Sequence, residues 1–123
     1  MTEKPFIVAI DGPAAAGKGT LARRLADEFG FAYLDTGALY RGVALSLIRA
    51  GVADPTESEA TKAALRLDLS LLRSPDLRLE ATGGMASRIA VMPAVRAALD
   101  ALQRRFAEIP PQGAPGAVID GRD

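Results

Sequence analysis

A small-residue loop between a short apolar run and an amphipathic stretch constrains the fold of this chain more than any other feature. Residues 6–10 read Phe-Ile-Val-Ala-Ile, which predicts a strand buried on both faces, as in a parallel sheet. Residues 12–20 read Gly-Pro-Ala-Ala-Ala-Gly-Lys-Gly-Thr. Beyond them, Leu21, Leu25 and Phe29 have the spacing of one helix face. A strand, a glycine-bounded loop and a helix in this order form the setting in which backbone N–H groups converge on a phosphate.

This loop predicts an ATP site. Small side chains let the backbone approach the phosphates, the helix start adds positive potential, and Lys18 neutralises the β and γ phosphates. Gly19 stands where the strict motif has Ser or Thr, so we expect Mg²⁺ to be held more through water than by a loop hydroxyl. A plain turn that happens to contain a lysine is the less favoured interpretation. The predicted ATP-binding residues are Gly12, Pro13, Ala14, Ala15, Ala16, Gly17, Lys18, Gly19 and Thr20.

The composition excludes several kinds of catalytic and metal site and argues against two classes of partner. With no Cys and no His, the chain has no disulfide, no Cys/His metal site, no thiol nucleophile and no imidazole acid or base. Its 15 basic and 15 acidic residues cancel, so no overall field attracts nucleic acid or an anionic membrane. No apolar run approaches the roughly 18 residues of a membrane span, and no signal-peptide pattern precedes the first strand. We therefore expect a soluble, cytoplasmic protein, in which local basic sites remain open.

The rest of the chain predicts strands and helices around a less regular middle segment. Further strands are expected at 31–34 and 117–119, and helices at 37–50, 58–65, 85–91 and from Pro93 onward. Leucines alternate with polar residues between Leu67 and Leu71, and Leu77 and Leu79 follow a Ser-Pro-Asp turn, which predicts a small hairpin. The order of elements predicts an α/β fold with a parallel sheet.

Four short stretches carry a family resemblance. They read Leu-Asp-Thr-Gly-Ala-Leu-Tyr-Arg at 34–41, Ala-Ser-Arg-Ile-Ala at 86–90, Pro-Ala-Val-Arg at 93–96 and Asp-Gly-Arg-Asp at 120–123. Together with the Gly-Lys-Gly-Thr end of the loop, they resemble the bacterial cytidylate kinases, which are P-loop nucleoside monophosphate kinases. The resemblance covers residues 5–51 and 86–123 well and residues 52–85 poorly. It implies the N-terminal strands of a three-layer α/β/α P-loop NTPase fold, with a short substrate-binding insert.

The resemblance also implies which residues form the site. Residues that contact the acceptor nucleotide, its phosphate or its sugar would be Thr36, Arg41, Arg122 and Asp123. Residues that read the cytosine edge would be Ser87 and Arg96, and those that neutralise charge during transfer would be Lys18, Arg41 and Arg122. Asp120, which closes the third apolar run, would hold Mg²⁺ through water. Helical arginines are more often solvated than functional, but their occurrence together with the loop favours function.

By the same resemblance, the expected reaction moves the γ-phosphoryl group of ATP onto the 5′-phosphate of CMP or dCMP. The acceptor oxygen is already anionic near neutral pH, so no strong general base is needed and the absence of His is no obstacle. Two alternatives stay open. One is a shikimate- or gluconate-type kinase that phosphorylates a hydroxyl, and the other is a module or fragment that binds ATP without turnover.

The chain departs from these kinases in two places. The segment 54–84 is short and lacks the usual pattern of the family's antiparallel insert. The family also continues beyond the Asp-Gly-Arg-Asp turn into further strands, a lid and covering helices, and its strand order of 2-3-1-4-5 makes strand one central. We therefore expect one truncated P-loop domain over 1–123, with 52–85 as its shortened insert, an unpaired far edge on strand one, and a monomer when the protein is full length.

Overall fold

The computed structural model describes residues 5–10 and 18–121. The chain divides into two compact units. The sheet unit comprises Met1–Thr36 and Gln103–Asp123, and the helical unit comprises Gly37–Leu102. Helix α2 (Thr36–Arg49) begins at the last residue of the first sheet-unit segment, and helix α5 (Pro93–Glu108) runs from the helical unit into the sheet unit. Both boundaries of the helical unit in the sequence therefore fall inside a helix.

The sheet unit holds a small parallel sheet. Its described strands are β1 (Phe6–Ile10), β2 (Ala32–Asp35) and β3 (Gly116–Asp120), in the order β1-β3-β2. Both neighbours run parallel to β3, and Asp120 at its end is in register with Ile10 of β1 and Asp35 of β2. The predicted α/β fold and parallel sheet are confirmed. As a result, the carboxyl ends of these strands meet at one edge of the sheet.

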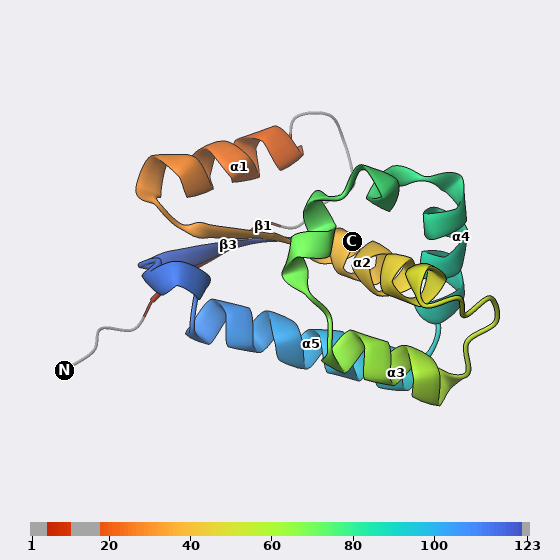
Figure 1. The fold of residues 1–123 in the computed structure, drawn as a ribbon. Helices are drawn as coiled ribbons and strands as arrows, with labels where there is room; N and C mark the ends of the chain where they lie inside the picture. The colour runs from red at the N-terminus through yellow and green to blue at the C-terminus, as the bar shows by residue number, and fades with distance from the viewer. Residues whose placement is uncertain (1–4, 11–17, 122–123) are drawn as a thin grey trace. The chain divides into compact units, whose positions relative to one another are not determined.

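Helix α1 (Lys18–Phe29) covers one face of this sheet, as Figure 1 shows. Ala22 and Ala26 of the helix are buried against Val118 of β3. Alanine side chains are short, so the helix lies close to the strand. Gly30, with a φ of 68°, ends the helix in a left-handed conformation that glycine adopts at little cost. The chain then turns directly into β2.

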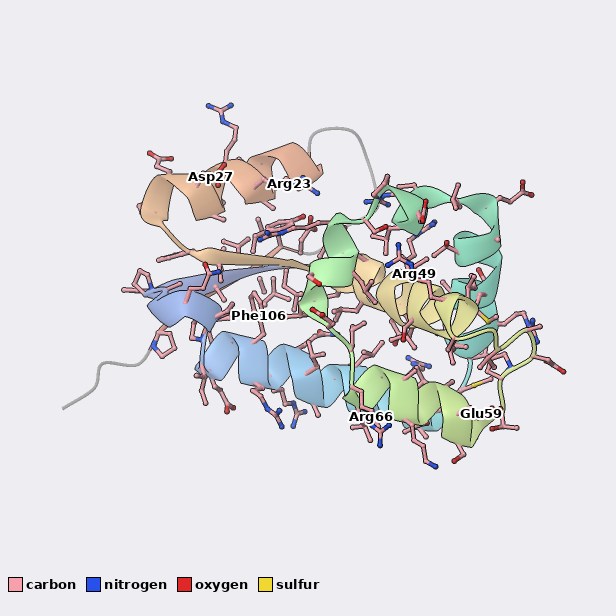
Figure 2. The ribbon with its side chains drawn as sticks, in the orientation of Figure 1. Arg23, Asp27, Arg49, Glu59, Arg66 and Phe106 are labelled. Carbon is pink, nitrogen blue, oxygen red and sulfur yellow. The ribbon has the colours of Figure 1, made fainter. Side chains whose placement is uncertain are left out.

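The opposite face of the sheet is covered by residues 103–108, the last part of α5 (Figure 1). Phe106, labelled in Figure 2, and Ala107 are both buried. Leu34 and Ala117 are buried on the strands, and the alternation of side chains along a strand directs Ala117 to the face opposite Val118. Apolar side chains thus fill both sides of the central strand.

Strand β1 is more exposed than the sequence predicts. Phe6 is 72% exposed and Ile7 is 56% exposed, so the prediction of a strand buried on both faces is wrong. Within the described ranges, β1 pairs with β3 alone and forms the edge of the sheet. The expected open edge of strand one is therefore present. The Phe6 ring stacks on the Phe31 ring at a centroid distance of 6.2 Å, and the centroids of the Phe29 and Phe31 rings lie 5.6 Å apart. These ring contacts shield part of the apolar surface.

The helical unit consists of helices joined by short turns. Its elements are α2 from Gly37 onward, α3 (Glu57–Leu65), η1 (Leu69–Arg73), η2 (Pro75–Arg78), α4 (Glu80–Ile89) and α5 up to Leu102. The helices predicted at 37–50, at 58–65 and from Pro93 are confirmed close to their predicted boundaries. Helix α4 begins earlier than predicted because the pair Gly83 and Gly84, a weak helix former, is helical here. None of the helices that the structure describes is long and apolar enough to cross a membrane.

The hairpin predicted between Leu67 and Leu79 is wrong, because the segment forms the two 3₁₀ helices η1 and η2. The Asp68 carboxylate accepts the backbone N–H of the second residue after it at 2.9 Å, and the Ser74 hydroxyl does the same at 3.2 Å. These local caps satisfy backbone donors that a strand would pair across a ladder. Leu77 is buried in one cluster with residues of α2. Helical caps and packing therefore outweigh the alternation of the leucines.

Helix α3 is fixed at its start by side-chain caps. The Thr56 hydroxyl accepts the backbone N–H of Glu59 at 3.1 Å, and the Glu59 carboxylate accepts the backbone N–H of Thr56 at 2.9 Å. The Glu57 carboxylate accepts the backbone N–H of Ala94 at 2.9 Å, in the first turn of α5. A carboxylate in that place also interacts favourably with the positive end of the helix dipole. Helices α3 and α5 thus both begin at charged or hydroxyl acceptors.

We expect Gly116→Ala to destabilise the protein. A Cβ at position 116 would lie 2.6 Å from the backbone oxygen of Phe6 and 3.0 Å from Cε1 of Phe31, and the backbone oxygen has no room to move within the paired strands. The free energy of unfolding should fall by about 1–3 kcal/mol, the usual cost of overpacking. Urea denaturation of the full-length protein measures this value, with Gly84→Ala as the control, because position 84 has open space beside it. Equal stability of the wild type and Gly116→Ala would contradict the described packing.

Candidate active site

The predicted site residues are distributed over both units. Lys18 is the first residue of α1, followed by Gly19 and Thr20, so the end of the predicted loop coincides with a helix N-terminus, where backbone N–H groups and the dipole favour anions. Arg122 and Asp123 lie outside the described residues, as do loop residues Gly12, Pro13, Ala14, Ala15, Ala16 and Gly17. Thr36 and Asp120 belong to the sheet unit, and Arg41, Ser87 and Arg96 belong to the helical unit.

Two carboxylates mark the carboxyl edge of the sheet. Asp35 ends β2 and Asp120 ends β3, and the two residues are paired in register. Residues in register on parallel strands point to the same face, so both carboxylates lie on the face that α1 covers. Asp120 is 4% exposed, although ionisable side chains are rarely buried without partners. A buried carboxylate at the end of a central parallel strand lies where open α/β sheets bind their ligands.

Hydrogen bonds hold Asp120 at this position. The Tyr33 hydroxyl donates to Oδ2 of Asp120 at 2.8 Å, and the Thr36 hydroxyl donates to the backbone oxygen of Asp120 at 3.1 Å. The backbone N–H of Gly121 donates to the carbonyl of Ile10 at 2.8 Å, which fixes the turn after β3 against the end of β1. The structure thus brings together Thr36 and Asp120, which the sequence predicts for separate roles. The Thr36 oxygen keeps lone pairs that can accept a further hydrogen bond.

Tyr33 is a site residue that the sequence did not predict. Burial, followed by its hydrogen bond to Asp120, raises the pKa of the Tyr33 hydroxyl to about 12 from the usual 10.0, so the group is a protonated donor at neutral pH. The Arg23 guanidinium lies 5.2 Å from the centroid of the Tyr33 ring, within the range of a cation–π contact. Strand alternation places Tyr33 on the same face as Asp35, and this signal was present in the sequence.

Arg41 is the most strongly constrained of the predicted residues in the helical unit. Its Nη1 donates to the backbone oxygen of Leu77 at 3.4 Å, and its guanidinium lies beside Gly83 of α4. Ser87 and Arg96 are exposed on α4 and α5. Arg41 is thus held against the main chain of η2 and α4, whereas Ser87 and Arg96 present their side chains to solvent.

The other charged residue of α2 has partners of its own. Arg49, labelled in Figure 2, lies on the same helix as Arg41 and donates to the Ser74 hydroxyl at 3.0 Å and to the Asp76 carboxylate at 3.4 Å. Both side chains of the Arg49–Asp76 ion pair are about half exposed, at 49% and 51%, so the pair adds little stability. Arg49 is therefore occupied on the surface, in contrast to the half-buried Arg41.

The carboxylates at the strand ends fit a magnesium ion that is bound mainly by phosphates. Over residues 5–10 and 18–121, no group of three or more His, Cys, Asp or Glu side chains could hold a metal by itself. Mg²⁺ at nucleotide sites needs only one or two carboxylates, since water and substrate phosphates complete its shell. Asp120, with Asp35 beside it in register, has the donor atoms that such an ion would need.

Comparisons with known proteins agree on one family. The family model described as cytidylate kinase matches residues 8–123. The chain is 58% identical to a cytidylate kinase of Rhodospirillum rubrum over 119 residues, 56% identical to one of Paramagnetospirillum magneticum over 117, and 54% identical to one of Brucella suis over 119. These matches cover 96%, 95% and 97% of the chain but 55%, 55% and 52% of the relatives. The chain thus spans about half the length of the curated relatives it matches.

We expect Tyr33→Phe to lower stability near neutral pH, because it removes the hydroxyl donor from the buried Asp120 carboxylate. The pKa of Tyr33 is raised in the folded state, so its contribution is fully present below about pH 10 and is lost as the pH rises toward 12. The difference in unfolding free energy between the wild type and Tyr33→Phe should therefore shrink over that pH range.

Urea denaturation of both full-length proteins at a series of pH values measures this difference. The phenylalanine keeps the ring above which Arg23 lies, so the comparison isolates the hydroxyl. A difference that stays constant up to pH 12 would contradict the assigned hydrogen bond, since the hydroxyl would then titrate alike in the folded and unfolded chains.

Proposed function

Because this chain belongs to the cytidylate kinase family, we propose that the protein transfers the γ-phosphoryl group of ATP to the phosphate of CMP or dCMP. The observation that carries the proposal is the buried Asp120 carboxylate at the end of the central strand. It lies in register with the end of β1, after which the predicted phosphate loop leads to Lys18. This combination supports a nucleotide phosphate at the carboxyl edge of the sheet.

The donor half of the proposed site is the loop from Gly12 to Thr20. Backbone N–H groups at the start of α1 would bind the ATP phosphates, and Lys18 would neutralise charge on the β and γ groups. Asp120 would hold Mg²⁺ through water, and the ion would balance charge on the same phosphates. Tyr33 and Thr36 support this role because they fix the carboxylate and the backbone of Asp120 before any ligand arrives.

The acceptor half of the proposed site depends mainly on arginines. Arg41 and Arg122 would bind the acceptor phosphate, since a guanidinium matches two phosphate oxygens at once. Ser87 and Arg96 would contact the cytosine edge, and their exposure leaves them accessible to a base. Thr36 and Asp123 would contact the acceptor nucleotide and its sugar.

The proposed chemistry depends on alignment and charge neutralisation. An oxygen of the CMP phosphate forms a bond to the γ-phosphorus while the bond from that phosphorus to the bridging oxygen of ADP breaks. The attacking oxygen is already ionised, so the site needs no general base, in keeping with a chain that has no histidine. Lys18, Arg41 and Arg122 would stabilise the charge that spreads over the transferred group.

We also propose one P-loop domain over the chain, with residues 52–85 as its insert, in a protein that acts as a monomer in the cytoplasm. The equal numbers of acidic and basic residues support small nucleotides, rather than nucleic acid or membranes, as its partners.

An assay of the full-length protein with ATP and Mg²⁺ tests the reaction. ADP formation should depend on CMP or dCMP and be weak with UMP, AMP and shikimate. Turnover with shikimate would instead identify a hydroxyl kinase. A protein that is stabilised by ATP but forms no ADP with any acceptor would be a binding module, and the proposed transfer would be wrong.

Two variants test the assigned roles. Lys18→Met should lower kcat by on the order of a hundredfold or more, because it removes a positive charge from the transferred group. Arg41→Met should raise KM for CMP by on the order of tenfold or more and leave KM for ATP nearly unchanged. Arg49→Met is the matched control, since Arg49 lies on the same helix and is paired on the surface. An equal effect of the Arg41 and Arg49 substitutions on KM for CMP would exclude the proposed role of Arg41.

A further inference from the structure

Arg41 packs against a glycine in the middle of a helix. A Cβ built on Gly83 of α4 would lie 3.2 Å from Nη1 of Arg41, 3.6 Å from Nη2 and 3.7 Å from Cζ. The guanidinium therefore occupies space that a side chain at position 83 would need. The shortest of these distances is tighter than ordinary van der Waals contact, so an alanine there would displace the guanidinium.

Nothing in the local conformation of α4 calls for glycine at this position. Gly83 donates a helical hydrogen bond to the Leu79 carbonyl at 3.0 Å, and its φ is not in the left-handed region. In the interior of a helix, glycine is less stable than alanine. The neighbouring Gly84 has nothing within 4 Å of its built Cβ. The contact with Arg41 is therefore what separates Gly83 from Gly84.

A second main-chain contact restricts the same guanidinium. The Leu77 carbonyl in η2 accepts from Nη1 of Arg41 at 3.4 Å, and the Leu77 side chain is 2% exposed in the cluster that contains Ala38 and Leu45 of α2. The carbonyl is thus fixed relative to the helix that bears Arg41. Several guanidinium N–H groups remain for another acceptor, and a phosphate is the acceptor that their planar arrangement suits.

We propose that Gly83 is a positioning residue for the acceptor phosphate. Its missing side chain lets the Arg41 guanidinium lie close against α4, and the Leu77 carbonyl sets the direction of the remaining donors. The proposal rests on the proposed function, in which Arg41 binds the phosphate of CMP. Elements η2 and α4 then contribute to phosphate recognition through Leu77 and Gly83.

The experiment compares Gly83→Ala with Gly84→Ala in the full-length protein. Both changes place alanine in the same helix, so both should keep or raise the melting temperature. Gly83→Ala should raise KM and the equilibrium Kd for CMP by about threefold to tenfold and leave KM for ATP unchanged, whereas Gly84→Ala should change none of these. A purely structural role for Gly83 predicts the reverse, with lower stability and no selective effect on CMP.

A double-mutant cycle with Arg41→Met tests whether Gly83 acts through Arg41. In the Arg41→Met background, Gly83→Ala should have no further effect on the Kd for CMP, because the group that it displaces is gone. Additive effects would overturn the proposal. Gly83→Ala with normal CMP binding, beside an Arg41→Met variant with weak binding, would overturn the inference and leave the proposed function in place. Normal CMP binding by Arg41→Met would contradict the acceptor role of Arg41 itself.

Discussion

The parallel pairing of β3 with both β1 and β2 is the constraint on which the rest of the sheet unit depends. It aligns the ends of the strands, so that Asp120 is in register with Ile10 and Asp35. It also makes β3 the central strand, whose two faces are covered by α1 and the end of α5, so the buried Asp120 carboxylate needs a donor. Tyr33 supplies that donor, and the carboxylate stays fixed before any ligand is present.

The sequence predicted the parts of the fold whose signals are local. A buried run at 117–119 and a regular apolar spacing along α1 and α5 depend on few distant contacts, and these elements are where they were expected. The hairpin prediction for residues 67–79 was wrong because it used only the alternation of the leucines. That pattern takes no account of the caps at Asp68 and Ser74, which favour 3₁₀ turns. The exposure of β1 was missed because an apolar run does not reveal whether a strand lies at the edge of a sheet.

The candidate site was predictable to a similar degree. Short motifs identified Thr36 and Asp120, and the alternation of β2 could have added Tyr33 to them. Gly83 is different, because the role that we propose for it depends on a contact with Arg41 of another helix. No spacing along the chain predicts that contact. Close contacts between segments that are distant in the sequence depend on the tertiary structure. A glycine in a helix therefore does not reveal which side chain packs beside it.

The long separation between β1 and β3 bears on the order in which the chain folds. Residues 6–10 pair with residues 116–120, and the whole helical unit, Gly37–Leu102, lies between them in the sequence. The helices of that unit close short loops, whereas the sheet must close a very long one, and the entropy of that closure is lost before any strand contact forms. On the ribosome, the helical unit can therefore form first. Strand β1, although synthesised before that unit, pairs with β3 only after the unit has been made.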